Sequence, residues 1–296
     1  MRVITLLPAA TEIVAALGGA GYLVGISHEC DYPASVQGLP RVTATPVDLA
    51  APGAAIDAEV RRLRDAGRPI IGIAADLLRQ LAPDLVITQG LCEVCAVADG
   101  EVHRLTAAMH PSPQVLSLEA RDLGGIWADI RRVGEALDLD DEAEELVLGL
   151  RSRVARLRAA TPADPPRVLC IEWLDPLYLA GHWVPELVEL AGGRDVGAQP
   201  GSHSARCEWR DLSRLEPDHV VVMLCGFGVE RARAELSSFE SFEALELLRR
   251  VPVSIIDGNA YTSRPGPRVV DGAQRIKSAL AGWACRDVER WQPQPH

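Results

Sequence analysis

The hydrophobic pattern of the chain repeats a simple unit: a short apolar run of the kind that forms a buried strand, then a longer stretch with apolar residues at helical spacing. One such unit opens at Arg2–Val3, and its helix is closed by Gly18–Gly19. A second opens at Arg167–Val168 and is closed by Gly192–Gly193. Glycine pairs are suited to helix C-caps. Strands that alternate with helices predict an α/β fold with mainly parallel sheets.

A second pair of segments shows that the chain contains two related halves. Residues from Leu81 to Thr88 read as the end of a helix, a Pro-Asp turn and a buried strand, and residues from Leu215 to Val222 have the same order. The sequence therefore predicts two Rossmann-like α/β lobes, at residues 1–120 and 166–296. Apolar residues at helical spacing in 121–165 predict a long linker helix, which the proline cluster at 162–166 ends.

Ligands of open parallel α/β sheets bind beyond the carboxyl ends of the strands. In this chain the segments that follow the predicted strands are rich in Cys, His, Trp, Tyr and Arg. Loops that serve only as turns would be rich in Gly, Asn, Ser and Asp instead. If the strand ends of the two lobes face each other, these residues line a ligand cleft between the lobes.

Aromatic side chains in these segments are candidates for stacking on a large planar ligand: Trp173, Trp183, Phe227 and Tyr261. The alternative for each of them is packing in a lobe core. Polar candidates accompany them: Glu172, His182, Arg264 and Arg268. A histidine nitrogen can bind a metal in the ligand, and arginines pair with carboxylate, amide or phosphate groups.

A cluster of soft metal ligands is predicted in the first lobe. Cys92 and Cys95 have the Cys-x-x-Cys spacing that lets two thiolates reach one metal, and His28 and Cys30 follow a neighbouring strand. Together they could hold Zn or Fe. Two alternatives remain open: buried thiols at loop bases, and a redox dithiol at Cys92 and Cys95.

Composition and charge exclude several classes of function. The chain has 296 residues with 30 Lys and Arg against 41 Asp and Glu, a net charge of −11, so neither nucleic acid nor an anionic membrane is expected as a partner. No apolar run is long enough for membrane insertion. Glu29, Glu93 and Glu172 are not paired at a fixed spacing, and no nucleophile or nucleotide motif is present, so no enzyme activity is expected.

The N-terminal segment predicts a first buried strand rather than a signal peptide, because its apolar run is short and ends at Pro8. Taken as complete, the chain is expected to be cytoplasmic. If a leader has been removed, the expected location is periplasmic or at the cell surface.

The sequence resembles the helical-backbone class of ABC-importer substrate-binding proteins, and among them the cobalamin-binding members. The resemblance rests on the segments Leu6–Glu12, Glu172–Pro176, Gly181–Gly193 and Arg264–Arg268. It implies two lobes, a linker helix, a ligand between the lobes and an importer permease as a possible partner. Relatives bind corrinoids, haem, siderophores or metal ions.

Two hypotheses follow from these observations. The first is a non-catalytic solute-binding protein for a corrinoid (cobalamin or cobinamide) or a similar metal macrocycle. The second is a cytoplasmic metalloprotein or enzyme with its own Zn or Fe centre on Cys30, Cys92, Cys95 and His28.

Overall fold

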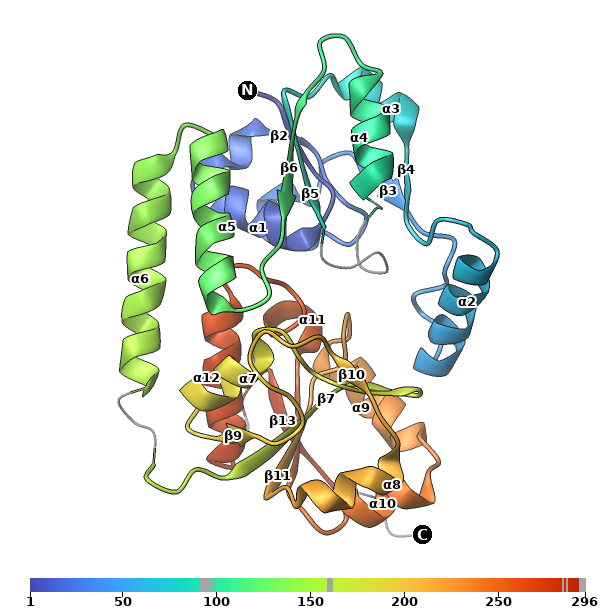
Figure 1. Cartoon of the computed structure of the whole chain (residues 1–296), viewed down its shortest axis with the longest axis vertical. Coiled ribbons are helices and arrows are strands. Elements are labelled where there is room, and N and C mark those ends of the chain that lie inside the picture. Colours follow the sequence, from blue (N-terminus) through green and yellow to red (C-terminus); the bar gives the residue numbers. More distant parts are fainter. Residues whose placement is uncertain (91–96, 98, 159–161, 284, 286, 293–296) are drawn as a thin grey trace. The chain divides into compact units, whose positions relative to one another are not determined.

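The computed structural model describes residues 1–90, 97, 99–158, 162–283, 285 and 287–292. The chain divides into two compact units. Unit 1 comprises residues 1–51, 55–120 and 124–149, and unit 2 comprises residues 52–54, 121–123 and 150–296. Each unit contains its own β-sheet with helices packed around it (Figure 1), so the predicted two-lobe α/β fold is confirmed.

The first half of the chain alternates short strands with helices. Its elements are β1 (Val3–Thr5), α1 (Pro8–Ala16), the 3-10 helix η1 (Gly19–Tyr22), β2 (Leu23–Gly25), η2 (Ala34–Val36), β3 (Thr43–Ala44), α2 (Gly53–Asp65), β4 (Gly72–Ile73), α3 (Ala75–Leu81), β5 (Leu85–Gln89), α4 (Asp99–Ala107), β6 (Gln114–Leu118) and α5 (Leu123–Ala136). Four strands form a sheet in the order β2-β1-β5-β6, and every pairing in it is parallel. β3 and β4 form a separate antiparallel pair.

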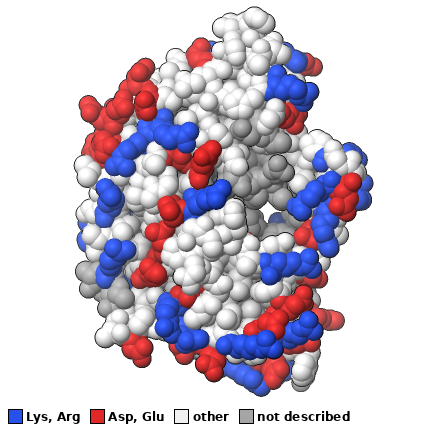
Figure 2. Space-filling view, in the orientation of Figure 1, with Lys and Arg blue, Asp and Glu red and all other residues white. Residues whose placement is uncertain are grey.

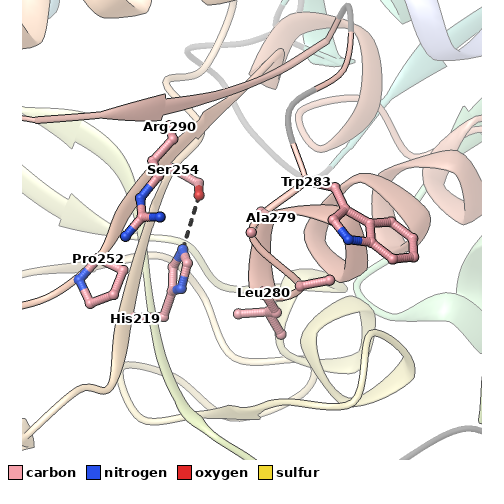
Figure 3. A pocket seen from close by; sticks show the side chains of 9 residues that line it. His219, Pro252, Ser254, Ala279, Leu280, Trp283 and Arg290 are labelled. Carbon is pink, nitrogen blue, oxygen red and sulfur yellow. Dashed lines mark hydrogen bonds between the residues drawn. The ribbon is translucent and has the colours of Figure 1, made fainter.

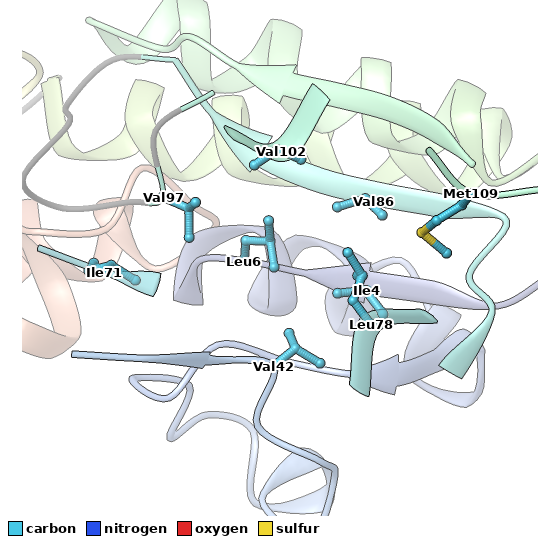
Figure 4. Packing of buried hydrophobic residues seen from close by; sticks show 9 residues of the cluster. All are labelled: Ile4, Leu6, Val42, Ile71, Leu78, Val86, Val97, Val102 and Met109. Carbon is cyan, nitrogen blue, oxygen red and sulfur yellow. The ribbon is translucent and has the colours of Figure 1, made fainter. Parts of the chain in front are cut away.

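One face of the unit 1 sheet carries a tightly packed apolar cluster (Figure 4). Ile4 of β1 and Val86 of β5 are fully buried in it, and Leu78 of α3 and Val102 of α4 pack onto the same face. These are the apolar positions of the short strands and of the helices that follow them, and the burial of their side chains stabilises unit 1.

The second half of the chain builds a larger, mixed sheet. Its elements are α6 (Asp140–Arg158), β7 (Arg167–Leu174), β8 (Leu177–Leu179), α7 (Val184–Leu190), β9 (Arg194–Asp195), β10 (Ala205–Arg206), α8 (Trp209–Leu212), η3 (Ser213–Leu215), β11 (His219–Val222), α9 (Val229–Ser238), α10 (Phe242–Leu248), β12 (Val253–Ile256), α11 (Gly258–Tyr261), α12 (Val269–Leu280) and β13 (Val288–Trp291). The strand order is β10-β8-β7-β11-β12-β13, and β9 also pairs with β7. β7, β9, β11 and β12 are parallel, whereas β8, β10 and β13 are antiparallel to their neighbours.

The internal repeat is present at the level of individual hydrogen bonds. In unit 1, Asp84 accepts a hydrogen bond from the Arg2 backbone N–H (2.6 Å) and its own N–H donates to the Arg2 carbonyl (2.8 Å). In unit 2, Asp218 makes the same two bonds with Arg167, both at 2.8 Å. Each Pro-Asp turn thus anchors the start of one parallel strand beside the start of the next.

The segment expected to hold the linker helix forms two helices, α5 and α6, separated by a turn. Asp138 adopts a left-handed conformation (φ 56°), which ends α5, and Leu139 N–H then bonds back to the Gly134 carbonyl (2.9 Å). A Cβ at Gly134 would lie 2.5 Å from the Ala143 Cβ, so glycine permits the close approach of the two helices. The boundary between the units falls within α6, after Gly149.

Candidate functional site

Three segments that follow parallel strands of unit 2 meet at the carboxyl edge of its sheet. Backbone hydrogen bonds join them: Cys225 N–H donates to the Glu172 carbonyl (3.0 Å), and Asn259 N–H donates to the Phe227 carbonyl (3.2 Å). A Cβ at Gly258 would lie 2.3 Å from the Leu224 carbonyl oxygen, so only glycine allows this approach. The segments after β7, β11 and β12 are therefore held as one surface, which we call the carboxyl-edge surface.

An aromatic and cationic stack lies on the carboxyl-edge surface. Trp173, at the end of β7, meets the ring of Phe227 edge to face, with ring centroids 5.4 Å apart. The guanidinium carbon of Arg231 lies 3.6 Å from the centroid of the Phe227 ring. Phe227 is buried and Trp173 is partly exposed. Phe227 therefore packs against the indole of Trp173, and a Cβ at Gly53 would lie 3.3 Å from the same indole, which leaves part of the ring exposed.

Tyr261 is held by a charged network at the same edge. Its hydroxyl donates to Asp287 (3.0 Å), and Arg275 pairs with Asp287 at 3.1 Å while its guanidinium lies 4.8 Å from the Tyr261 ring centroid. The guanidinium of Arg268 also faces this ring, at 5.8 Å. Burial, followed by the hydrogen bond to Asp287, raises the pKa of Tyr261, so the phenol remains protonated at neutral pH.

Arg264 positions the loop after β12. Its guanidinium donates to the Asn259 side-chain oxygen (2.7 Å), and only 6% of the residue is exposed. Asp257, at the end of β12, caps α11 by accepting from Ala260 N–H (2.7 Å). Burial raises the pKa of Asp257. In this arrangement Arg264 fixes the loop from within.

His182 has a strained backbone and a partly buried imidazole ring. Its backbone is left-handed (φ 54°), and its Nδ1 is buried with no hydrogen-bond partner in the structure. The ring stacks on Trp183 (5.6 Å) and meets His203 edge to face (5.2 Å). Burial, then the nearby His203 and Arg121, lowers the pKa of His182, so its ring is neutral at neutral pH. Strain of this kind is common at functional sites.

Trp183 occupies the interior of unit 2, in contrast to Trp173. It is 5% exposed, and its indole N–H donates to the Thr262 carbonyl (2.8 Å). This hydrogen bond ties the loop of His182 to the segment after β12. In the structure Trp183 is therefore packed in the interior, and contact of its indole with a ligand stays a prediction.

Two of the four predicted metal ligands have other partners in unit 1. Cys30 is 1% exposed, and its thiol lies 3.0 Å from the Thr11 hydroxyl, which is itself bonded to Thr5 (2.6 Å). The Nδ1 of His28 lies 2.7 Å from the Thr43 hydroxyl. Burial, followed by the charge of Arg41, lowers the pKa of His28.

Cys92 and Cys95 lie outside the described residues. Within the part of the chain that the structure does describe, no three His, Cys, Asp or Glu side chains are grouped so that they could hold a metal ion. The predicted Zn or Fe centre therefore stays a prediction that depends on these two cysteines.

Three residues near the candidate site were not predicted from the sequence. Arg231 lies on α9 and reaches back to Phe227, His203 belongs to a loop without periodicity, and Asp287 follows the last long helix. The spacing of Phe227 and Arg231 across the start of α9 is the one clue that could have been found, because residues four apart meet at a helix start.

The surface charge has no single sign on the face shown in Figure 2, where acidic and basic side chains are intermixed. Among the described helices, none combines the length and the hydropathy that a bilayer crossing requires.

Comparison with known proteins shows which family the chain matches. The family model described as "Periplasmic binding protein" matches residues 3–244. A vitamin B12-binding protein of Pectobacterium atrosepticum is 22% identical over 289 residues, which cover 95% of this chain and 88% of that protein.

Two solved structures share the fold over almost the whole chain. A periplasmic heme-binding protein from Pseudomonas aeruginosa superposes with a TM-score of 0.75 at 20% identity, over 100% of this chain and 99% of that one. The periplasmic vitamin B12-binding protein of Vibrio cholerae superposes with a TM-score of 0.63 at 20% identity, over 95% and 96% of the two chains. These relatives are binding proteins, not enzymes. Because the family model matches most of the chain, this protein belongs to the periplasmic binding protein family.

Proposed function

We propose that this protein binds a planar metal macrocycle, a corrinoid or a haem, on the carboxyl-edge surface of unit 2 and delivers it to an importer permease. The observation that carries the proposal is the Trp173–Phe227–Arg231 stack. A partly exposed indole, supported from behind by a buried ring, is a suitable platform for a large flat ligand. The fold shared with vitamin B12-binding and heme-binding proteins supports the same ligand class.

Preorganisation of the surface supports the proposal further. The three strand-end segments are locked by backbone hydrogen bonds, and Arg264 holds the last of them from inside. A ligand that meets a surface already in its binding conformation loses less free energy to ordering of the protein. Glu172, Arg268 and Tyr261 belong to this surface and would contact the polar side chains at the rim of the macrocycle.

His182 supplies a nitrogen that could bind the metal of the ligand. Neutral imidazole is a common metal ligand, and the Nδ1 of His182 is buried without a partner while its pKa is lowered. His203, whose ring lies 5.2 Å from that of His182, is the second nitrogen-bearing side chain at this position. The ligand itself brings the metal, so this proposal requires no metal centre of the protein's own.

The experiment is a titration of the purified protein with hydroxocobalamin, diaquocobinamide and haemin, followed by absorption spectroscopy and calorimetry. The proposal predicts a saturable spectral change with at least one of them. Saturation with a corrinoid but not with haemin identifies the cargo as a corrinoid, and the reverse result identifies it as a haem. No spectral change and no heat with any of the three overturns the proposal.

Metal analysis of the freshly purified protein distinguishes this proposal from the alternative hypothesis of a protein with its own Zn or Fe centre. Stoichiometric Zn or Fe that is lost in a Cys92→Ser, Cys95→Ser double variant would establish the metalloprotein. The expected location, cytoplasmic or periplasmic, and the position of the ligand between the lobes stay predictions.

A further inference from the structure

A cavity of about 220 Å³ lies in unit 2 at the opposite end of the sheet from the carboxyl-edge surface. His219 is the first residue of β11 and Pro252 immediately precedes β12, so the cavity opens at the amino ends of these parallel strands (Figure 3). The end of α12 and the edge strand β13 form the rest of its lining. Its position separates it from the proposed macrocycle site.

The strand side of the cavity is polar. The Nε2 of His219 lies 3.0 Å from the Ser254 hydroxyl, and both residues are buried, with 8% and 3% of their surfaces exposed. Arg290 of β13 stands beside them in Figure 3. A buried hydrogen-bonded histidine and serine in a layer of otherwise apolar strand residues offer polar atoms at the base of a hollow.

The helix side of the cavity is apolar. Leu280, the last residue of α12, and Trp283, which follows the helix, line this side, and in Figure 3 the indole of Trp283 extends away from the strand residues. Trp283 is 71% exposed, which is unusual for so large an apolar side chain. The helix end itself is capped: Gly282 is left-handed (φ 72°), and Trp283 N–H bonds back to the Ser278 carbonyl (2.9 Å). This capping satisfies a carbonyl that would otherwise attract a cation.

The cavity carries one positive charge. Arg290 is the one charged side chain among the described residues of its lining, and the carboxylate next to it in sequence, Glu289, faces Arg233 at 3.8 Å. Burial, followed by the charge of Arg290, lowers the pKa of His219 to about 4, so the imidazole is neutral at neutral pH. Because the one charged side chain of the described lining is positive, the hollow favours an anion.

We propose that this cavity is a second binding site, independent of the macrocycle site, for a small organic carboxylate. Its carboxylate would pair with Arg290, and its apolar body would lie against Leu280 and Trp283. Pockets for drug-sized ligands occupy about 300–1,000 Å³, so a ligand of the size of benzoate suits the smaller volume found here.

The test uses benzoate as the probe, with benzamide as its neutral analogue, in calorimetric titrations of the full chain at neutral pH. The proposal predicts saturable binding of benzoate and about tenfold weaker binding of benzamide, because the amide carries no charge for Arg290. Arg290→Gln is expected to weaken benzoate binding by about tenfold, and Trp283→Ala to weaken it by a smaller factor. Trp283 is exposed, so this second variant should keep its fold.

The matched control is Arg206→Gln, which removes an exposed arginine of β10, at the opposite edge of the unit 2 sheet from β13. Its affinity for benzoate should equal that of the unchanged protein. The proposal is overturned if benzoate does not bind, if benzamide binds equally well, or if Arg290→Gln and Arg206→Gln have the same affinity. Far-UV circular dichroism of each variant confirms that the fold is retained.

Discussion

Two tryptophans that look equivalent in the sequence differ in exposure, because the indole N–H of one of them is hydrogen-bonded inside unit 2. The sequence predicts loops for both Trp173 and Trp183, which favoured them as ligand contacts, and the structure places Trp173 at the end of β7. Trp183 turns inward, where the Thr262 carbonyl accepts its indole N–H. Trp173 remains partly exposed and is supported by Phe227. Local sequence could not separate the two, because the partner of each comes from a segment more than fifty residues away.

At His182 we expect a change in the coordination of the ligand metal. His182→Ala should abolish the shift in the visible absorption of bound diaquocobinamide or haemin that a nitrogen ligand produces. Since the pKa of His182 is lowered, this shift should persist in the unchanged protein as the pH falls through the usual histidine range, and disappear once the ring is protonated. His110→Ala, an exposed histidine of unit 1, is the control. Identical spectra for His182→Ala and the unchanged protein would contradict a metal–nitrogen bond.

Asp195 should give the protein an unusual dependence of stability on pH. Burial raises its pKa from 3.8 to about 6, although Gly197 and Ala198 N–H groups donate to it. The folded state therefore binds more protons than the unfolded state between about pH 4 and 6. The free energy of unfolding should fall across this window as pH rises, by at most about 3 kcal/mol from this group.

The measurement is chemical denaturation of the unchanged protein and of Asp195→Asn at several pH values. The amide keeps an oxygen that can accept from Gly197 and Ala198 but does not titrate, so the fall assigned to Asp195 should vanish. Asp164→Asn, at an exposed position, should retain it. A pH profile unchanged by Asp195→Asn would show that this carboxyl does not titrate in the window.

At the level of elements, the repeated Pro-Asp turns should contribute directly to stability. Asp218→Ala removes a charge-assisted hydrogen bond to the Arg167 backbone, and we expect the free energy of unfolding to fall by about 1 kcal/mol. Asp211→Ala, which breaks an exposed pair with Arg214 at 3.4 Å, should have a much smaller effect. Urea denaturation compares the two variants, and equal losses would mean that the turn bond adds nothing beyond a surface ion pair.

The elements that the sequence predicted well are those in which pattern and local chemistry agree. The two Pro-Asp turns and the glycine-terminated helices were evident because each is made by neighbouring residues. The break between α5 and α6 was missed, since the apolar stripe continues across Asp138 and only its left-handed backbone interrupts the helix. The antiparallel strands β8, β10 and β13 were missed as well, because two or three residues give too short a pattern and β13 pairs with a strand more than thirty residues earlier.

At the level of the whole molecule, the candidate site is a product of topology. Its residues come from the ends of β7, β11 and β12, which the parallel sheet brings to one edge. The rule that ligands bind beyond the carboxyl ends of strands therefore selected segments that do lie together at one edge of the sheet. It could not find Arg231, His203 or Asp287, because these side chains reach the edge from a helix and from loops that no strand pattern marks.

The most direct test of the account compares the affinity of a metal macrocycle for the unchanged protein, for Trp173→Ala and for Phe242→Ala, by absorption titration with whichever of the three ligands binds. Phe242 is an aromatic residue of the same unit, 79% exposed and outside the carboxyl-edge surface. We predict that Trp173→Ala raises the dissociation constant by about tenfold, as expected for the loss of one stacking contact, and that Phe242→Ala leaves it unchanged. Equal dissociation constants for the two variants would contradict binding of the ligand on the Trp173 surface.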